Sequence, residues 1–121
     1  MEQATLTLDR LMGLERIPLA PNLREIPVNL AMAELAIARQ DWEQAWTAYD
    51  HAVQCLHSLE MPFREASALC DWADGRQKRG EFEDLSQRRQ LLQQALAIYS
   101  RLDLSYYVEQ IEQRIQNELP A

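Results

Sequence analysis

The residues best suited to bind a metal ion are two histidines and a cysteine that lie close together in the chain. His51 and Cys55 are four residues apart, so they would share one face of a helix. His57 follows His51 by six residues, which places it about 240° round that helix. A third ligand would therefore have to come from a neighbour such as Asp71 or Cys70. We expect no metal site, and we interpret His51 and Cys55 as part of a half-buried contact between helices.

No arrangement of side chains in the sequence predicts a reaction. Ser/His/Asp, Cys/His and paired-carboxylate sets are not placed convincingly, and the two histidines fall within one predicted helix. The chain has only 3 Gly and no glycine-rich loop that could bind phosphate. We therefore expect a protein that is not an enzyme and that needs no cofactor.

The charge of the chain is acidic. The 12 Lys and Arg against 19 Asp and Glu give a net charge of -7, which would repel phosphate backbones and anionic lipids. Acidic residues interleave the basic ones, so we interpret the latter as a solvated face: Arg76, Lys78, Arg79, Arg88 and Arg89. No apolar run approaches the ~20 residues that span a bilayer, and no signal-peptide pattern is present. We expect a cytoplasmic protein that binds neither nucleic acid nor membrane.

Three tryptophans could form an aromatic ligand cage. Trp42 and Trp46 lie four residues apart, and Trp72 is the third. Aromatic residues at helical spacing usually belong to the core, and we expect the same here. Gly75 interrupts a predicted helix, at a cost of about 1 kcal/mol relative to Ala. It marks either a close approach of another backbone or a neutral surface position.

Helices must position these side chains, because the apolar residues keep helical spacing and no stretch has the alternation of a strand. Short loops make successive helices antiparallel, apart from a longer connection near Pro18 and Pro21. The sequence predicts an all-α fold of about six helices, at residues 2–12, 23–39, 42–58, 63–79, 85–101 and 105–118.

Two of the expected helix starts follow from capping residues. Asp41 and Asp84 each lie three positions before a glutamine, whose side chain can reach back to the cap. We therefore expect the fifth helix to begin at Asp84 or Leu85, after an extended connector over residues 81–83.

Two stretches of the chain are copies of each other. Residues 33–46 align with residues 73–86 at an offset of 40, and a three-residue insertion then changes the offset to 43 through to the C-terminus. A two-helix unit with a period in this range predicts an α-solenoid of antiparallel helix pairs. The first copy has Gln40 where the second has Gly80, and a residue just past a helix often needs positive φ, so we expect local strain at Gln40.

We expect these units to form a single domain over residues 1–121. Its parts would be an N-terminal helix and linker, two repeats and a C-terminal capping helix, at residues 1–22, 23–58, 63–101 and 105–119. The positions that we expect to be buried between helices are Ala33, Tyr49, Trp72, Ala73, Leu92 and Tyr99.

The order of residues in the two copies resembles the tetratricopeptide repeat (TPR). The resemblance rests on Ala33, Gln40, Asp41, Trp42, Ala45, Tyr49 and Ala52 in the first copy and on Ala73, Gly80, Glu81, Phe82 and Ala95 in the second. The segments SLEMPFREASAL and ALAIYSRLDLSYYVEQIEQRI resemble the C-terminal TPR region of large bacterial signalling proteins, which carry ATPase, adenylyl cyclase or MalT-like and LuxR-type regulator modules. The resemblance covers about residues 23–119 and implies a scaffold that binds a partner or ligand.

In TPR arrays the first helix of each pair lines the concave face, so the resemblance implies a binding surface there. The side chains that it would place on that face are Leu30, Glu34, Ile37, Ser67, Cys70, Asp74, Gln77, Gln110 and Gln113. Such a mixed apolar and acidic surface suits a protein or peptide segment with a basic or apolar face.

The two ends of the chain differ. The final helix carries apolar residues on one side and polar residues around the rest, as a terminal cap requires. The first helix has an apolar patch with no earlier partner in this chain, formed by Leu6, Leu8, Leu11 and Met12. We therefore expect a protein-interaction or sensory scaffold at the C-terminal end of a larger regulator. The alternative is a self-association module, whose first helix pairs the parent protein into a homodimer.

Overall fold

The computed structural model describes residues 25–118, which form five helices joined by short turns. These are α2 (Glu25–Ala38), α3 (Trp42–Ser58), α4 (Pro62–Arg79), α5 (Phe82–Arg101) and α6 (Ser105–Glu118). No strand occurs in this range, so the predicted all-α class is confirmed. None of these helices is long and apolar enough to cross a membrane. The expected first helix, and with it Leu6, Leu8, Leu11 and Met12, lies outside the described residues.

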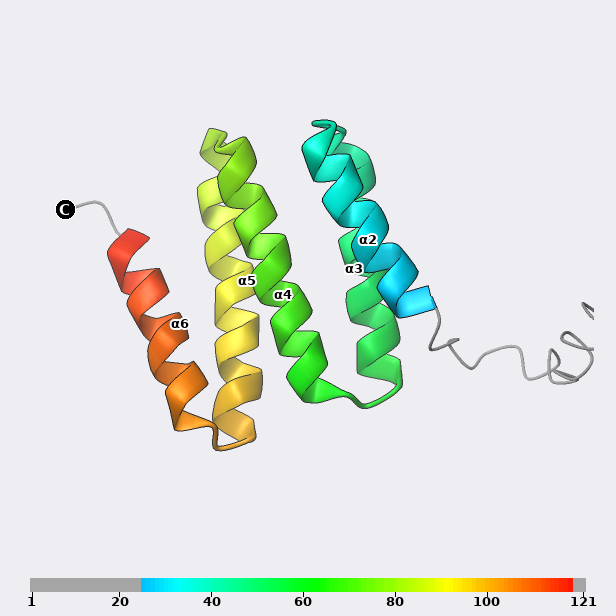
Figure 1. The fold of residues 1–121 in the computed structure, drawn as a ribbon. Coiled ribbons are helices and arrows are strands. Elements are labelled where there is room, and N and C mark those ends of the chain that lie inside the picture. The colour runs from blue at the N-terminus through cyan, green and yellow to red at the C-terminus, as the bar shows by residue number, and fades with distance from the viewer. Residues whose placement is uncertain (1–24, 119–121) are drawn as a thin grey trace, which may run out of the picture.

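The helices lie in antiparallel pairs. α2 pairs with α3, α4 pairs with α5, and α6 packs on α5, while α3 also packs on α4 and so joins the two pairs (Figure 1). In Figure 1, α2 and α4 lie side by side in a front layer, with α3 and α5 behind them. One face of the molecule is therefore formed mainly by α2 and α4.

Three of the helices end in the same way, on a non-glycine residue in the left-handed conformation. These residues are Gln40, Glu60 and Asp103, with φ values of 62°, 55° and 60°. In each case the N–H of the next residue donates to the carbonyl five positions earlier, as in a Schellman motif. Gly80 takes the same conformation after α4, with φ of 69°. The positive φ expected at Gln40 is confirmed, and it recurs at two further turns.

The start of α5 differs from the expectation. The helix begins at Phe82 with Glu81 as its N-cap residue, so residues 81–83 are not an extended connector. Asp84 lies at the third helical position, where its Oδ2 accepts a hydrogen bond from the Glu81 N–H at 3.0 Å. A carboxylate at this position satisfies a backbone donor that the first turn leaves free, and it opposes the positive end of the helix dipole. Phe82 and Glu83 therefore belong to the helix, and of the expected connector only the N-cap residue Glu81 is extended.

The core lies mainly within the helix pairs, between α4, α5 and α6 and between α2 and α3, and contains small residues where helices approach closely. The positions buried as expected are Ala33, Tyr49, Ala73, Leu92 and Tyr99. Trp72 is half-buried and stacks on Tyr49, with the ring centroids 6.1 Å apart. Trp46 stacks on Trp42 at a centroid separation of 5.9 Å. The tryptophans thus pack with one another and with core rings.

Gly75 is buried in α4, facing the α2–α3 pair. A Cβ atom built on it would lie 3.0 Å from Ile37 Cδ1 and 3.3 Å from a ring carbon of Trp46. Such separations are tighter than ordinary contacts, so this position marks a close approach. The neighbours are side chains, whereas the sequence suggested a backbone.

Two of the basic residues of α4, Arg76 and Arg79, do not lie on a solvated face, contrary to expectation, whereas Lys78 is exposed as expected. The Arg76 and Arg79 side chains are only 13% and 14% exposed, and both guanidinium groups lie over the Trp46 ring. Each lies 2.7 Å from a carboxylate oxygen of Asp84, which is itself buried. Burial alone would raise the pKa of Asp84, but the hydrogen bonds from Arg79 and Arg76 lower it to about 2. The buried acid therefore explains why the arginines turn inward.

Candidate functional site

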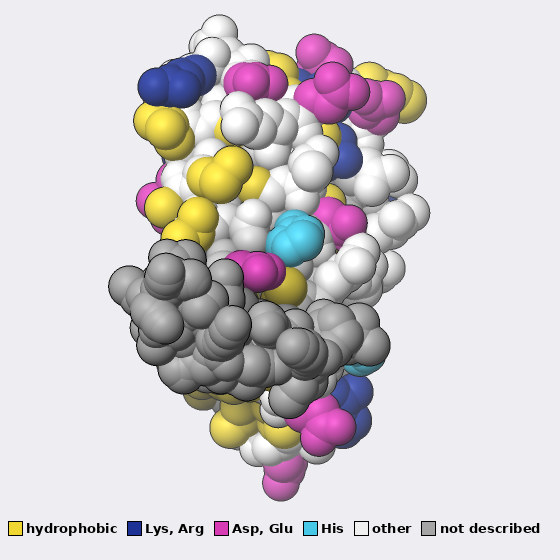
Figure 2. Space-filling view, turned by 90° about the vertical axis from the view of Figure 1, so that its right-hand side faces the viewer, with side chains coloured by type: hydrophobic (Ala, Val, Ile, Leu, Met, Phe, Trp, Pro, Cys, Tyr) yellow, Lys and Arg dark blue, Asp and Glu magenta, His cyan; other side chains and the backbone are white. Residues whose placement is uncertain are grey.

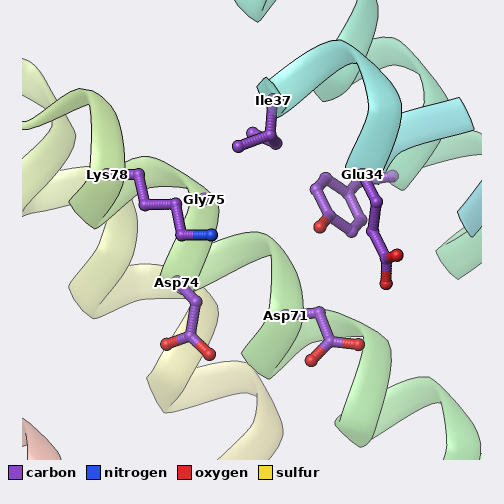
Figure 3. A pocket seen from close by; sticks show the side chains of 7 residues that line it. Glu34, Ile37, Asp71, Asp74, Gly75 and Lys78 are labelled. Carbon is purple, nitrogen blue, oxygen red and sulfur yellow. The ribbon is translucent and has the colours of Figure 1, made fainter. Parts of the chain in front are cut away.

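A cavity of about 280 Å³ opens between α2 and α4, on the face that these two helices form (Figure 3). Its walls are Glu34 and Ile37 from α2, Tyr49 from α3, and Asp71, Asp74, Gly75 and Lys78 from α4. We call this cavity the α2–α4 groove.

Helical spacing brings these side chains to one place. On α4, Asp71, Asp74 and Lys78 recur at intervals of three and four residues, so they share one face. On α2, Glu34 and Ile37 are three residues apart and lie across the gap from them (Figure 3). The groove is thus built from one stripe on each of two neighbouring helices.

The groove carries an excess of negative charge. Glu34, Asp71 and Asp74 supply three carboxylates, against the single ammonium of Lys78 among the lining residues. Burial raises the pKa of Asp71, the nearby Asp74 and Glu34 raise it further, and Arg114 acts in the opposite direction. A cation bound beside Asp71 would therefore relieve repulsion between these carboxylates.

Tyr49 forms the back of the groove. Burial, followed by the charges of Asp71, Glu34 and Asp74, raises its pKa to about 12. The phenol therefore stays neutral at physiological pH and can both donate and accept a hydrogen bond. The lining groups are thus suited to ion pairing and hydrogen bonding.

Arg114 of α6 closes one end of this acidic region by pairing with Asp74. The two side chains are 31% and 52% exposed, so the pair lies at the surface and links α6 to α4. Cys70 lies close to this pair. Burial raises the pKa of its thiol to about 11; Arg114 opposes this shift, while Asp74 and Asp71 add to it. Sequence reasoning missed Arg114, because we counted it with the polar outer face of the last helix.

A second, smaller cavity of about 190 Å³ continues the groove along α4 and shares Asp71 with it. Leu30 and Leu56 form apolar wall, with Phe63, Arg64, Ser67 and Ala68 of α4 around them. The two cavities together present an acidic half and a more apolar half.

The structure brings together some of the residues expected on the concave face. Glu34, Ile37 and Asp74 line the larger cavity, and Leu30 and Ser67 line the smaller one. The others line neither cavity: Cys70 is half-buried against the core, and Gln77, Gln110 and Gln113 are exposed.

Sequence reasoning missed Tyr49, Asp71, Gly75 and Lys78 as lining residues. The spacing of Asp71, which follows Ser67 by four residues and precedes Asp74 by three, would have found it.

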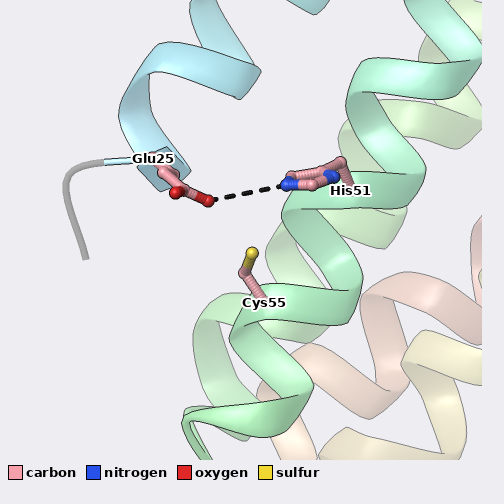
Figure 4. A group of neighbouring side chains, drawn as sticks. All are labelled: Glu25, His51 and Cys55. Atoms are coloured by element: carbon pink, nitrogen blue, oxygen red, sulfur yellow. Dashed lines mark ion pairs between the residues drawn. The ribbon is translucent and has the colours of Figure 1, made fainter. Parts of the chain in front are cut away.

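A separate group of three possible metal ligands lies at the α2–α3 contact (Figure 4). Glu25 of α2 approaches His51 and Cys55 of α3, and one ligand atom from each lies within 4.8 Å of the other two. His57 is not part of this group. Its Nδ1 lies 3.3 Å from Glu65 Oε1 of α4, as its place on the other side of α3 requires. Glu25 thus supplies the third possible ligand, which sequence reasoning had sought at Asp71 or Cys70.

Comparisons with protein-family models, with curated proteins and with solved structures found no match to this chain.

Proposed function

We propose that the chain is a non-catalytic scaffold of the TPR type, whose α2–α4 groove binds a protein or peptide segment. Antiparallel helix pairs with α2 and α4 side by side support a short solenoid of this kind, as does the internal repeat of the sequence. We further propose that it acts in the cytoplasm as part of a larger bacterial regulator. That part of the proposal rests on the sequence resemblance.

The observation that carries the proposal is the charge of the groove. Three carboxylates around one cavity favour a lysine or arginine side chain, since an opposite charge lowers their mutual repulsion. The smaller cavity adds apolar wall from Leu30 and Leu56 next to the acidic part. A segment that alternates basic and apolar residues matches both halves, and a helix or an extended strand could present them.

Binding of two synthetic peptides tests this proposal. One is a basic amphipathic peptide, and the other has the same apolar residues with glutamate in place of lysine. We expect the basic peptide to bind, to weaken as salt is raised, and to shift the amide NMR signals of Glu34, Asp71 and Tyr49. Equal binding of both peptides, or signal shifts confined to another face, would contradict the proposal.

Charge-neutralising variants locate the site. Glu34→Gln and Asp71→Asn should each weaken the basic peptide about two- to fivefold, as expected for a partly exposed ion pair. Glu109→Gln removes the same charge from the exposed side of α6 and should leave binding unchanged. An effect of the control as large as that at the groove would mean that only net charge matters.

One observation favours the alternative, a self-association module. α2 exposes an apolar stripe of Val28, Met32 and Leu35, residues that are 57%, 40% and 49% exposed. Their spacing of four and three residues places them on one side of the helix, and Figure 2 shows hydrophobic side chains gathered along one side of this end of the molecule. Such a stripe tends to find a partner.

Sedimentation velocity over a concentration series tests this alternative. If the module self-associates, the chain should form a dimer, and Met32→Glu with Leu35→Glu should leave it monomeric with unchanged helicity. A chain that is monomeric at all concentrations would rule the alternative out.

A further inference from the structure

Glu25, His51 and Cys55 present three different ligand atoms to one point at the start of α2 (Figure 4). The atoms are a carboxylate oxygen, an imidazole nitrogen and a thiol sulfur. Among residues 25–118, no other set of three such side chains comes this close together. We propose that this group binds one Zn²⁺ ion, which would link the first turn of α2 to the middle of α3. The proposal departs from our expectation that the chain has no metal site.

The donor set selects the class of cation. Zn²⁺ accepts sulfur, nitrogen and oxygen ligands in one site, whereas Mg²⁺ and Ca²⁺ prefer oxygen alone and Cu(I) prefers sulfur. With the thiol ionised, the ligands carry two negative charges, which balance those of the ion. Three protein ligands leave the fourth tetrahedral position to water, as in open zinc sites.

The distances suit such an ion. Ligand atoms at zinc bond lengths of about 2.0–2.3 Å lie about 3.3–3.8 Å from one another in a tetrahedron. His51 Nε2 lies 3.5 Å from Glu25 Oε1, within this range. All three ligand atoms lie within 4.8 Å of one another, so an inward shift of about 1 Å by the thiol or its partners would complete the geometry.

Accessibility differs among the three ligands in a way that favours capture from solvent. The Glu25 and His51 side chains are 50% and 57% exposed, so an ion can reach them directly. Cys55 is only 8% exposed and packs in a cluster with Ile26, Leu56 and Ala68. A bound ion would therefore contact the mostly buried sulfur of Cys55 and two exposed ligands, Glu25 and His51, whose side chains can adjust to it.

The chain offers an internal comparison. His57 and Glu65 form a second contact between an imidazole and a carboxylate, at 3.3 Å, without a third ligand at metal-binding distance. A histidine and a carboxylate therefore pair in this chain without a thiol beside them. The thiol of Cys55 is the feature that distinguishes the Glu25–His51 pair from the His57–Glu65 pair. His57 and Cys70 are also the only other histidine and cysteine in the chain, so they serve as matched controls.

Zinc titration of the tag-free full-length chain tests the proposal, with calorimetry for stoichiometry and affinity and Co²⁺ absorption for the ligand type. We expect one ion per chain, a thiolate-to-Co²⁺ charge-transfer band, and a higher Tm with excess Zn²⁺. Glu25→Gln, His51→Gln and Cys55→Ser should each weaken binding more than about tenfold, whereas His57→Gln and Cys70→Ser should leave it within about twofold.

The Glu25→Gln variant keeps the test decisive even if Cys55→Ser fails to fold, because Glu25 is exposed at the first residue of α2. Absence of stoichiometric binding would overturn the proposal. So would binding that survives Glu25→Gln unchanged, or binding that is lost in His57→Gln or Cys70→Ser.

Discussion

Arg79 at the end of α4 holds Asp84 in the first turn of α5 through two hydrogen bonds. Nε donates to Oδ2 at 2.7 Å and Nη2 donates to Oδ1 at 2.9 Å. This two-point contact fixes both position and angle, as a single ammonium could not. Asp84 also accepts from Arg76 and from the Glu81 N–H, so one buried carboxylate joins two helices and the turn between them. We therefore expect the packing of α4 against the start of α5 to depend on the Asp84 carboxylate.

Replacing Asp84 by Asn should destabilise the fold by about 3 kcal/mol, because it removes the buried carboxylate charge that two largely buried guanidinium groups share. The measurement is urea unfolding followed by circular dichroism. Glu83→Gln is the matched control: Glu83 also pairs with Arg79, at 3.0 Å, but its side chain is 69% exposed. That change should cost less than about 1 kcal/mol. Equal losses of unfolding free energy in Asp84→Asn and Glu83→Gln would mean that the buried ion pairs of Asp84 contribute no more to stability than the exposed pair of Glu83.

Acid should remove the contribution of Asp84 in a defined range. Its folded pKa of about 2 lies below the ordinary aspartate value of 3.8, so the folded state favours the ionised form. The stability that results is present above pH 4 and is lost as the pH falls towards 2, and it amounts to about 2 kcal/mol. The difference in unfolding free energy between the wild type and Asp84→Asn should therefore shrink between pH 4 and pH 2. A difference that stays constant over this range would contradict the assignment.

The sequence was a sufficient guide to the helices within residues 25–118 and to most of the buried positions. Most helical stripes of apolar residues face the core, so the burial of Ala33, Ala73 and Leu92 could be predicted from spacing, although the stripe of Val28, Met32 and Leu35 is exposed. The start of α5 could not be predicted from the sequence in this way. Asp84 can act as an N-cap or as the third residue of a helix, and the choice depends on Arg76 and Arg79, which approach it only in the folded chain.

The candidate sites were less accessible to sequence reasoning, because each lies between helices. Spacing along α4 could have identified Asp71, but that Glu34 lies opposite depends on how α2 and α4 pack. Glu25 joins His51 and Cys55 across 26 residues of sequence for the same reason. A pattern within one helix predicts which residues share a face, and only the packing shows which faces meet.

Replacing Gln40 by Gly should stabilise the fold by about 0.5–1 kcal/mol, because glycine adopts φ near 62° without the steric penalty of a Cβ atom. Thermal unfolding measures the effect. The same substitution at Gln94, exposed inside α5, should instead destabilise by about 1 kcal/mol, since the backbone there is helical. A loss of stability at Gln40 would show that its side chain contributes more than the strain costs.

Gly75→Ala should destabilise the fold, although alanine is the better helix former by about 1 kcal/mol. The new methyl group would lie 3.0 Å from Ile37 Cδ1, and overpacking of this kind costs about 1–3 kcal/mol. Ile37→Val removes the Cδ1 atom, so in that background Gly75→Ala should be less harmful by about 1 kcal/mol. The four proteins of this double-mutant cycle can be compared by denaturant unfolding. Strictly additive effects would mean that the new methyl group does not clash with Ile37. The clash would then be with Trp46, whose ring carbon would lie 3.3 Å away.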